Sequence, residues 1–154
     1  MPPQAHVLAE TKVVVDRNTN TIVLRRTFAA SPADVFDAWT QPEQVACWWD
    51  PAGSRLAECE IDLRPGGAFK FVSKGHPEFP FSGIYREIVA PERLVFEALG
   101  STGKVMLENV DGETLLTVTI ACRSPAQLDQ FLKMGVDAGT AQTLDNLVAY
   151  LGSK

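Results

Sequence analysis

The chain has 154 residues, of which 45% are hydrophobic and 21% charged, the composition of an ordinary globular protein with one core. The formal net charge is −5 and no Lys/Arg cluster occurs, so nucleic acid is not expected as a partner. No apolar run approaches the roughly 18 residues of a membrane span, and the start lacks a signal peptide's pattern. These features predict a cytoplasmic protein without membrane contact.

The cysteines argue against a disulfide framework. Cys47, Cys59 and Cys122 are odd in number and include no Cys-x-x-Cys pair. A structural zinc site is therefore not expected either, and no metal or cofactor is predicted.

The first ten residues carry little pattern, so a mobile tail over residues 1–10 and a single domain over 11–152 are predicted. Apolar residues at 13–15 and 22–24 flank a polar stretch at 16–20 with strong turn chemistry. This arrangement predicts a first hairpin whose second strand reaches about residue 29.

Two short helices are expected next. Ser31 can accept hydrogen bonds from free N–H groups at a helix start, and Pro32 suits the first helical position. Pro42 ends this helix and opens a second one, which reaches about Trp48.

From residue 54 to residue 122 the hydrophobic pattern changes to period two, which is typical of antiparallel strands with one wet face. Asp111-Gly112 between two alternating runs is the strongest hairpin signal in the chain. The predicted strands are 57–63, 68–73, 81–89, 93–99, 104–110 and 114–122, with turns at 65–67, 90–92, 100–103 and 111–112.

A final helix is predicted from Ser124, a capping residue followed by proline, to about Leu151. Its apolar stripe changes face near Gly135 and Gly139, and each glycine costs about 1 kcal/mol in a helix interior. A continuous helix with a packing reason for the glycines and a break into two helices both fit this pattern.

The order of elements predicts an α+β fold, in which a curved antiparallel sheet wraps around a long C-terminal helix and two short helices follow the first strands. A doubly wound fold is excluded because the central strands lack intervening helices.

Several sequence blocks occur in a characteristic order: FAASP at 28–32, VFDAWT at 35–40, PE at 42–43 with WW at 48–49, DLRPGG at 62–67, GIYREI at 83–88, PERLVF at 91–96 and LDNL at 144–147. In these blocks the chain resembles the bacterial single-domain Aha1-like proteins of the START/Bet v 1-like (SRPBCC) superfamily. The resemblance implies a helix-grip fold with a cavity between sheet and C-terminal helix. Members of the superfamily bind lipids, hormones or antibiotics, cyclise polyketides or assist chaperones, so the fold alone does not select an activity.

No catalytic constellation is recognisable in the sequence. His76 lies in a Gly/Pro loop without a second histidine, which favours a solvated loop residue over a general base. Glu58, Glu60 and Asp62 alternate with apolar residues, so we interpret them as the wet face of a strand. Arg64 is the exception, because its guanidinium suits a ligand carboxylate.

The leading hypothesis is therefore a binding protein for a small hydrophobic molecule. Adjacent tryptophans near a helix end point in different directions, so one can pack in the core while the other faces the cavity. The candidate cavity residues are Trp48, Trp49, Arg64, Phe69, Phe71, Phe81, Tyr85, Phe131, Met134, Gly135 and Ala138.

Two alternatives stay open. One is an enzyme of cyclase or hydrolase type that uses Tyr85, Glu60 or Arg64 in the same cavity. The other is an interaction module, with chaperone contact as in the co-chaperone that gives the family its name. A homodimer is a further expectation, because it would explain the displaced apolar stripe of the last helix.

Overall fold

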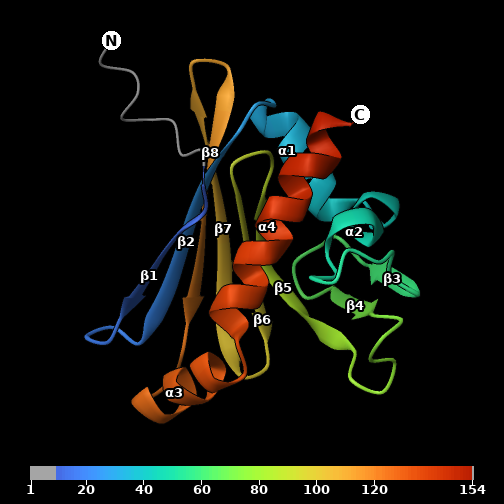
Figure 1. Cartoon of the computed structure of the whole chain (residues 1–154). Helices are drawn as coiled ribbons and strands as arrows, with labels where there is room; N and C mark the ends of the chain where they lie inside the picture. Colours follow the sequence, from blue (N-terminus) through green and yellow to red (C-terminus); the bar gives the residue numbers. More distant parts are fainter. Residues whose placement is uncertain (1–9, 154) are drawn as a thin grey trace.

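The computed structural model describes residues 10–153, and Figure 1 shows a curved sheet with a long helix lying diagonally across its inner face. Except for Glu10, the tail expected at residues 1–10 lies outside the described residues. Within the described chain, no helix is long and apolar enough to cross a membrane.

All eight strands pair antiparallel in one sheet, in the order β1-β2-β8-β7-β6-β5-β4-β3. The pairing of β2 with β8 brings the start and the end of the strand region together and aligns Leu24 with Val118. The strands are β1 Lys12–Asp16, β2 Thr21–Phe28, β3 Glu58–Ile61, β4 Ala68–Val72, β5 Phe81–Val89, β6 Arg93–Ala98, β7 Ser101–Val110 and β8 Glu113–Ala121. The predicted helix-grip architecture is confirmed.

The turn expected at residues 100–103 is shorter than predicted, because β7 already begins at Ser101. Leu99 and Gly100 alone make the connection, with φ angles of 55° and 74°. Two residues with positive φ match the twist of paired strands. Gly103 lies within β7, and a Cβ at this position would meet the Phe96 ring at 2.4 Å. The glycine thus makes room for an aromatic ring, rather than forming a turn.

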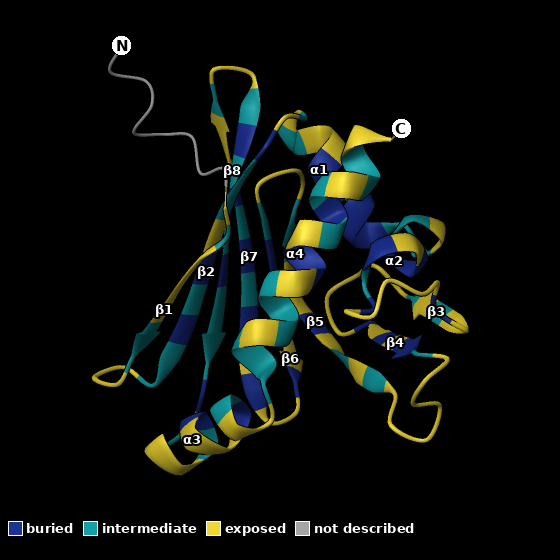
Figure 2. Cartoon of the chain, viewed as in Figure 1, coloured by how far each residue is buried: buried dark blue, intermediate teal, exposed yellow. Residues whose placement is uncertain are grey.

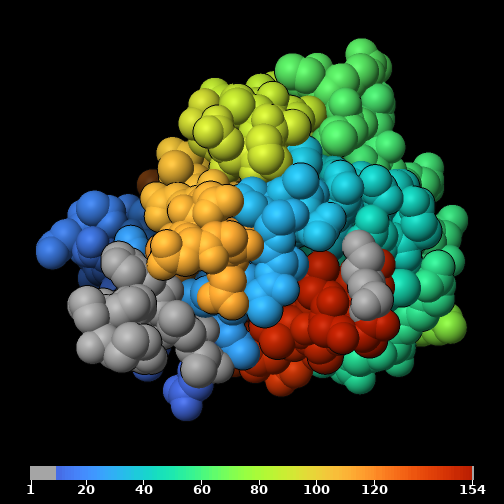
Figure 3. All heavy atoms as spheres, turned by 90° about the horizontal axis from the view of Figure 1, so that it is seen from above, coloured from blue at the N-terminus to red at the C-terminus, as the bar shows by residue number. Residues whose placement is uncertain are grey.

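Helices α1 (Pro32–Thr40) and α2 (Pro42–Trp48) follow the first hairpin as predicted. The Ser31 side chain accepts a hydrogen bond from the Asp34 N–H at 3.2 Å, which caps α1. Seen from above, α1 lies between the C-terminal turns of the last helix and the β5–β6 and β7–β8 hairpin ends (Figure 3). This helix therefore covers that end of the sheet.

Of the two alternatives for the final helix, the structure shows the break. Helix α3 (Pro125–Lys133) ends before Gly135, which has a φ of 76°, and α4 (Val136–Gly152) follows. A left-handed residue ends a helix at little cost only if it lacks a Cβ. Gly139 lies inside α4 and has a regular helical environment. The apolar stripe changes face because the chain changes direction at Gly135.

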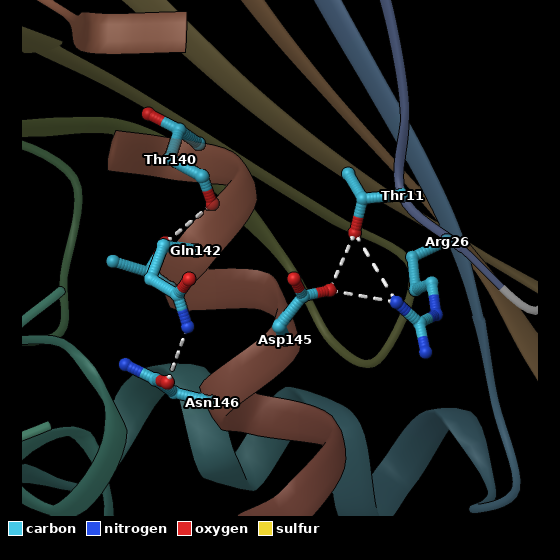
Figure 4. A network of polar contacts seen from close by, with 7 residues as sticks. Thr11, Arg26, Thr140, Gln142, Asp145 and Asn146 are labelled. Atoms are coloured by element: carbon cyan, nitrogen blue, oxygen red, sulfur yellow. Dashed lines mark hydrogen bonds and ion pairs between the residues drawn. The ribbon is translucent and has the colours of Figure 1, made fainter. Parts of the chain in front are cut away.

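The C-terminal half of α4 is fixed to the rest of the molecule by polar contacts (Figure 4). Asp145 accepts hydrogen bonds from Arg26 of β2 at 2.7 Å and from Thr11 at 3.1 Å. Asn146 donates to the backbone oxygen of Asp50 at 2.9 Å, beyond the end of α2. These bonds hold α4 between the first strands and the helix pair.

Buried residues are distributed unevenly over the fold (Figure 2). Buried residues concentrate in α1, α2 and the central strands, whereas β1 and most of α3 are exposed or intermediate. Leu144 and Leu147 of α4 have no exposed surface. The core therefore lies between the sheet, α1, α2 and the C-terminal half of α4.

Candidate functional site

Two adjoining cavities lie between the inner face of the sheet and the helices. The larger has a volume of about 100 Å³ and the smaller about 20 Å³. Both are bordered by Trp39, Trp49, Phe81 and Phe96. These four aromatic side chains, which we call the aromatic partition, divide one hollow into two chambers.

The larger cavity lies beside the β6–β7 turn, under the junction of α3 and α4. Leu99 of that turn borders it and is 54% exposed, so the cavity reaches the surface there. Gln127 of α3 donates to the Leu99 backbone oxygen at 3.2 Å and ties α3 to the turn. Besides the aromatic partition, the wall consists of Ala98, Leu99, Ser101, Gly103, Val118, Ile120, Phe131, Val136, Thr140 and Thr143.

The aromatic partition belongs to a larger cluster of rings in tilted and edge-to-face contact. The centroid of Trp49 lies 5.0 Å from that of Phe71 and 5.1 Å from that of Phe81. Such pairs add about 0.5–1.5 kcal/mol each beyond the burial of their surface. The cluster therefore gives the cavity rigid apolar walls on the side of α2 and β4.

The indole N–H of Trp39 is an exception to good polar pairing. It is buried and has no hydrogen-bond partner among residues 10–153. The neighbouring Trp48, by contrast, donates its N–H to the Ala38 backbone oxygen at 3.0 Å. A buried donor without an acceptor costs about 1–3 kcal/mol, so the unpaired N–H of Trp39 lowers the stability of the protein beside the cavity.

The cavity walls carry no charge within the described chain. Neither lining includes Asp, Glu, Lys, Arg or His. Tyr85 borders the smaller chamber, and burial raises the pKa of its hydroxyl, with the nearby Cys59 thiol adding to the shift. The phenol group is therefore neutral at physiological pH, and the whole hollow is electrically neutral.

Two buried hydroxyls border the larger cavity. Ser101 donates its proton to the Ala98 backbone oxygen at 2.9 Å. Thr143 donates to the Thr140 backbone oxygen at 2.7 Å, in the previous turn of α4. The wall thus contains two buried oxygens whose protons are already engaged, besides the half-buried side chain of Thr140.

Residues 29–152 match the family model described as Activator of Hsp90 ATPase homolog 1-like protein. The chain belongs to this family. No curated protein matches the sequence at a significant level.

Solved structures of similar fold cover nearly the whole chain of this AHSA1-like protein. A Rhodobacter sphaeroides protein is 22% identical with a TM-score of 0.83, covering 94% of this chain and 99% of its own. A Mycobacterium smegmatis protein is 22% identical with a TM-score of 0.81, covering 93% and 98%. A Nitrosomonas europaea protein is 27% identical with a TM-score of 0.79, covering 86% and 94%. Family and neighbours together support the Bet v 1-like, SRPBCC-type fold that the sequence resembles.

The structure brings most of the aromatic candidates of this AHSA1-like chain together at the hollow. Strands β4 and β5 supply several of them, and α3 supplies another at the far end of the larger cavity. The predicted residues that border a cavity are Trp49, Phe69, Phe71, Phe81, Tyr85 and Phe131.

The other candidates lie outside both linings. Trp48 is buried behind Trp49, while Arg64 is exposed and pairs with Asp62 at 2.9 Å. Met134 is 61% exposed in the α3–α4 junction. Gly135 forms the break itself and Ala138 is exposed, because the change of direction turns a different face of α4 to the sheet.

That face of α4 consists of Val136, Thr140 and Thr143, which sequence reasoning missed. Their spacing of four and three residues places them on one side of a helix. The spacing was visible in the sequence, but two of the three residues are polar and so did not stand out as a cavity wall. Trp39 and Ser101 were missed as well.

The acid–base arrangement considered from the sequence is not assembled. Glu60 and Arg64 are exposed, whereas Tyr85 is buried at the smaller chamber. These three residues therefore do not converge on one cavity. Among the described residues, no group of three or more His, Cys, Asp or Glu side chains could hold a metal ion.

Proposed function

We propose that this AHSA1-like protein binds a small, largely apolar molecule in the larger cavity, between the sheet and the first turns of α4. The observation that supports this most directly is an apolar hollow of about 100 Å³ that reaches the surface beside Leu99. Ligand sites are typically concave, mostly apolar and equipped with a few polar groups. The cavity has these three properties.

The volume sets the size of the ligand. An engineered apolar cavity of about 150 Å³ is large enough to bind benzene. A cavity of about 100 Å³ that opens toward solvent therefore suits one ring, with part of the molecule at the mouth near Leu99.

Binding is favoured over catalysis because the walls hold no ionised group that could act as an acid or base. A molecule of about seven non-hydrogen atoms gains at most roughly 1.5 kcal/mol per atom, and usually much less. We therefore expect dissociation constants in roughly the micromolar to millimolar range.

A titration of the protein with toluene, followed by ligand-detected NMR, tests this proposal. Wild type is expected to show saturable binding. Val136→Phe should abolish it by filling the cavity from the first turn of α4. Val14→Phe is the matched control, since the same change on the exposed strand β1 should leave binding intact. Absence of binding to wild type, or equal binding to Val136→Phe, would contradict the proposal.

A further inference from the structure

Ser101 and Thr143 give the larger cavity a specific hydrogen-bonding character. Both side chains border it, and Ser101 is 9% and Thr143 5% exposed. A hydroxyl has one proton to donate and two lone pairs that accept. Each proton is used within the protein, by Ala98 O and Thr140 O respectively. What these hydroxyls offer to the cavity is therefore an acceptor, not a donor.

The acceptor capacity of both oxygens is unused in the part of the chain that the structure describes. No hydrogen bond of the described residues is accepted by Ser101 Oγ or Thr143 Oγ1. An apolar ligand without a donor would cover these oxygens and remove them from water without replacement, which is unfavourable. A ligand with an O–H or N–H group would satisfy at least one of them.

The neutral walls restrict the ligand further. A carboxylate or ammonium group would enter a cavity that has no opposite charge, and burying an unpaired charge costs far more than a hydrogen bond returns. The donor must therefore belong to an uncharged molecule. Together with the volume of about 100 Å³, this leaves single-ring compounds with a neutral donor.

We infer that the ligand is a small, uncharged ring compound carrying a hydroxyl, such as a phenol or a cyclic alcohol, which donates to Thr143 Oγ1 or Ser101 Oγ. This inference rests on the proposed function and adds the chemical class to it. The ring lies against the apolar wall of Val118, Phe131 and Val136.

Three ring compounds of similar size separate the contributions of a hydrogen-bond donor, a hydrogen-bond acceptor and the apolar ring to binding. Phenol has a donor, anisole has an oxygen that only accepts, and toluene has neither. Because phenol is better hydrated than toluene, the two affinities in wild type are not compared directly. For each compound, the ratio of dissociation constants between a variant and wild type cancels its hydration.

Thr143→Val keeps the branched shape of the side chain and removes only the hydroxyl, and Ser101→Ala does the same for the smaller residue. In the double variant, phenol should bind about three- to tenfold more weakly than to wild type, the value of one hydrogen bond. Anisole and toluene should bind the double variant as they bind wild type, or slightly better. The two single variants show which oxygen accepts.

Thr40→Val is the matched control, because Thr40 is also buried and donates to a backbone oxygen, that of Phe36 at 2.8 Å, but borders neither cavity. This variant should leave phenol binding unchanged. Urea unfolding of each variant shows whether it retains the fold.

The outcomes distinguish this inference from the function on which it rests. If none of the three compounds binds wild type, the proposed function itself fails. If all three bind and the double variant weakens none selectively, the hydroxyl inference is overturned while apolar binding stands. If anisole weakens together with phenol, the protein hydroxyls donate to the ligand, which also overturns the inference.

Discussion

The two halves of α4 use the same helical geometry for different purposes. In the C-terminal half, Leu144 and Leu147 have no exposed surface, and Asp145 is bound to Arg26. In the N-terminal half, Val136 and Thr143 border the larger cavity. One half fastens the helix to the sheet, and the other forms the wall of an open space.

This division explains how the fold tolerates a hollow of this size. A cavity removes packing contacts and so reduces stability in proportion to its volume. Here the larger cavity lies toward the end near α3, while α1, α2 and the C-terminal half of α4 supply most of the packed core. The molecule can therefore keep space for a ligand at one end because the other end carries most of the packing.

The largest expected difference between the halves concerns packing. Leu147→Ala should lower the free energy of unfolding by about 2–5 kcal/mol, because it creates a cavity in a fully buried site. Val136→Ala removes a side chain that already borders open space, so we expect a loss below about 1 kcal/mol. Urea denaturation measures both values. Equal losses would show that the two halves of α4 are packed alike.

A smaller effect is expected at the ion pair of the C-terminal half. Asp145→Asn should cost about 1–2 kcal/mol, because the Arg26 side chain is only 14% exposed and would lose its charged partner. Asp129→Asn is the matched control. Its pair with Arg17 is largely solvent-exposed on both sides and is worth about 0–1 kcal/mol. Thermal unfolding of the two variants compares them. If Asp145→Asn is as mild as the control, the pair does not fasten α4.

The smallest effects concern the two glycines, whose replacement by alanine should change the free energy of unfolding in opposite directions. Gly135→Ala should destabilise the protein by about 1 kcal/mol, since the φ of 76° is unfavourable for a residue with a Cβ. Gly139→Ala should stabilise it by about 0.5–1 kcal/mol, because that site is helical and a Cβ would meet no atom within 4 Å. Equilibrium unfolding gives both differences, and the same sign for both would contradict the break at Gly135.

The fold could be predicted well from the sequence because local signals agree with it. The strand predicted at residues 81–89 has the same bounds as β5, and the Asp-Gly turn at 111–112 joins β7 to β8. The break in the last helix could not be located, since two glycines four residues apart carry the same propensity. The position of the β6–β7 turn was wrong because a leucine with positive φ at residue 99 has no sequence signature.

The candidate site could be predicted only on its aromatic side. Large rings on alternating strand positions indicate an enclosed apolar face, and Phe69, Phe71 and Phe81 indeed meet there. The opposite wall depends on how α4 is rotated after Gly135, which no local pattern determines. Chaperone contact, a homodimer and a cytoplasmic location stay predictions.

One measurement tests the central claim, which is that a small apolar molecule binds beside the N-terminal half of α4. Methyl-labelled protein saturated with toluene is examined by NMR for Overhauser effects between ring protons and methyl groups. We predict contacts to Val118, Ile120 and Val136, which border the larger cavity, and none to Leu147. Contacts confined to exposed methyl groups such as those of Val14, or no contacts at all, would contradict it.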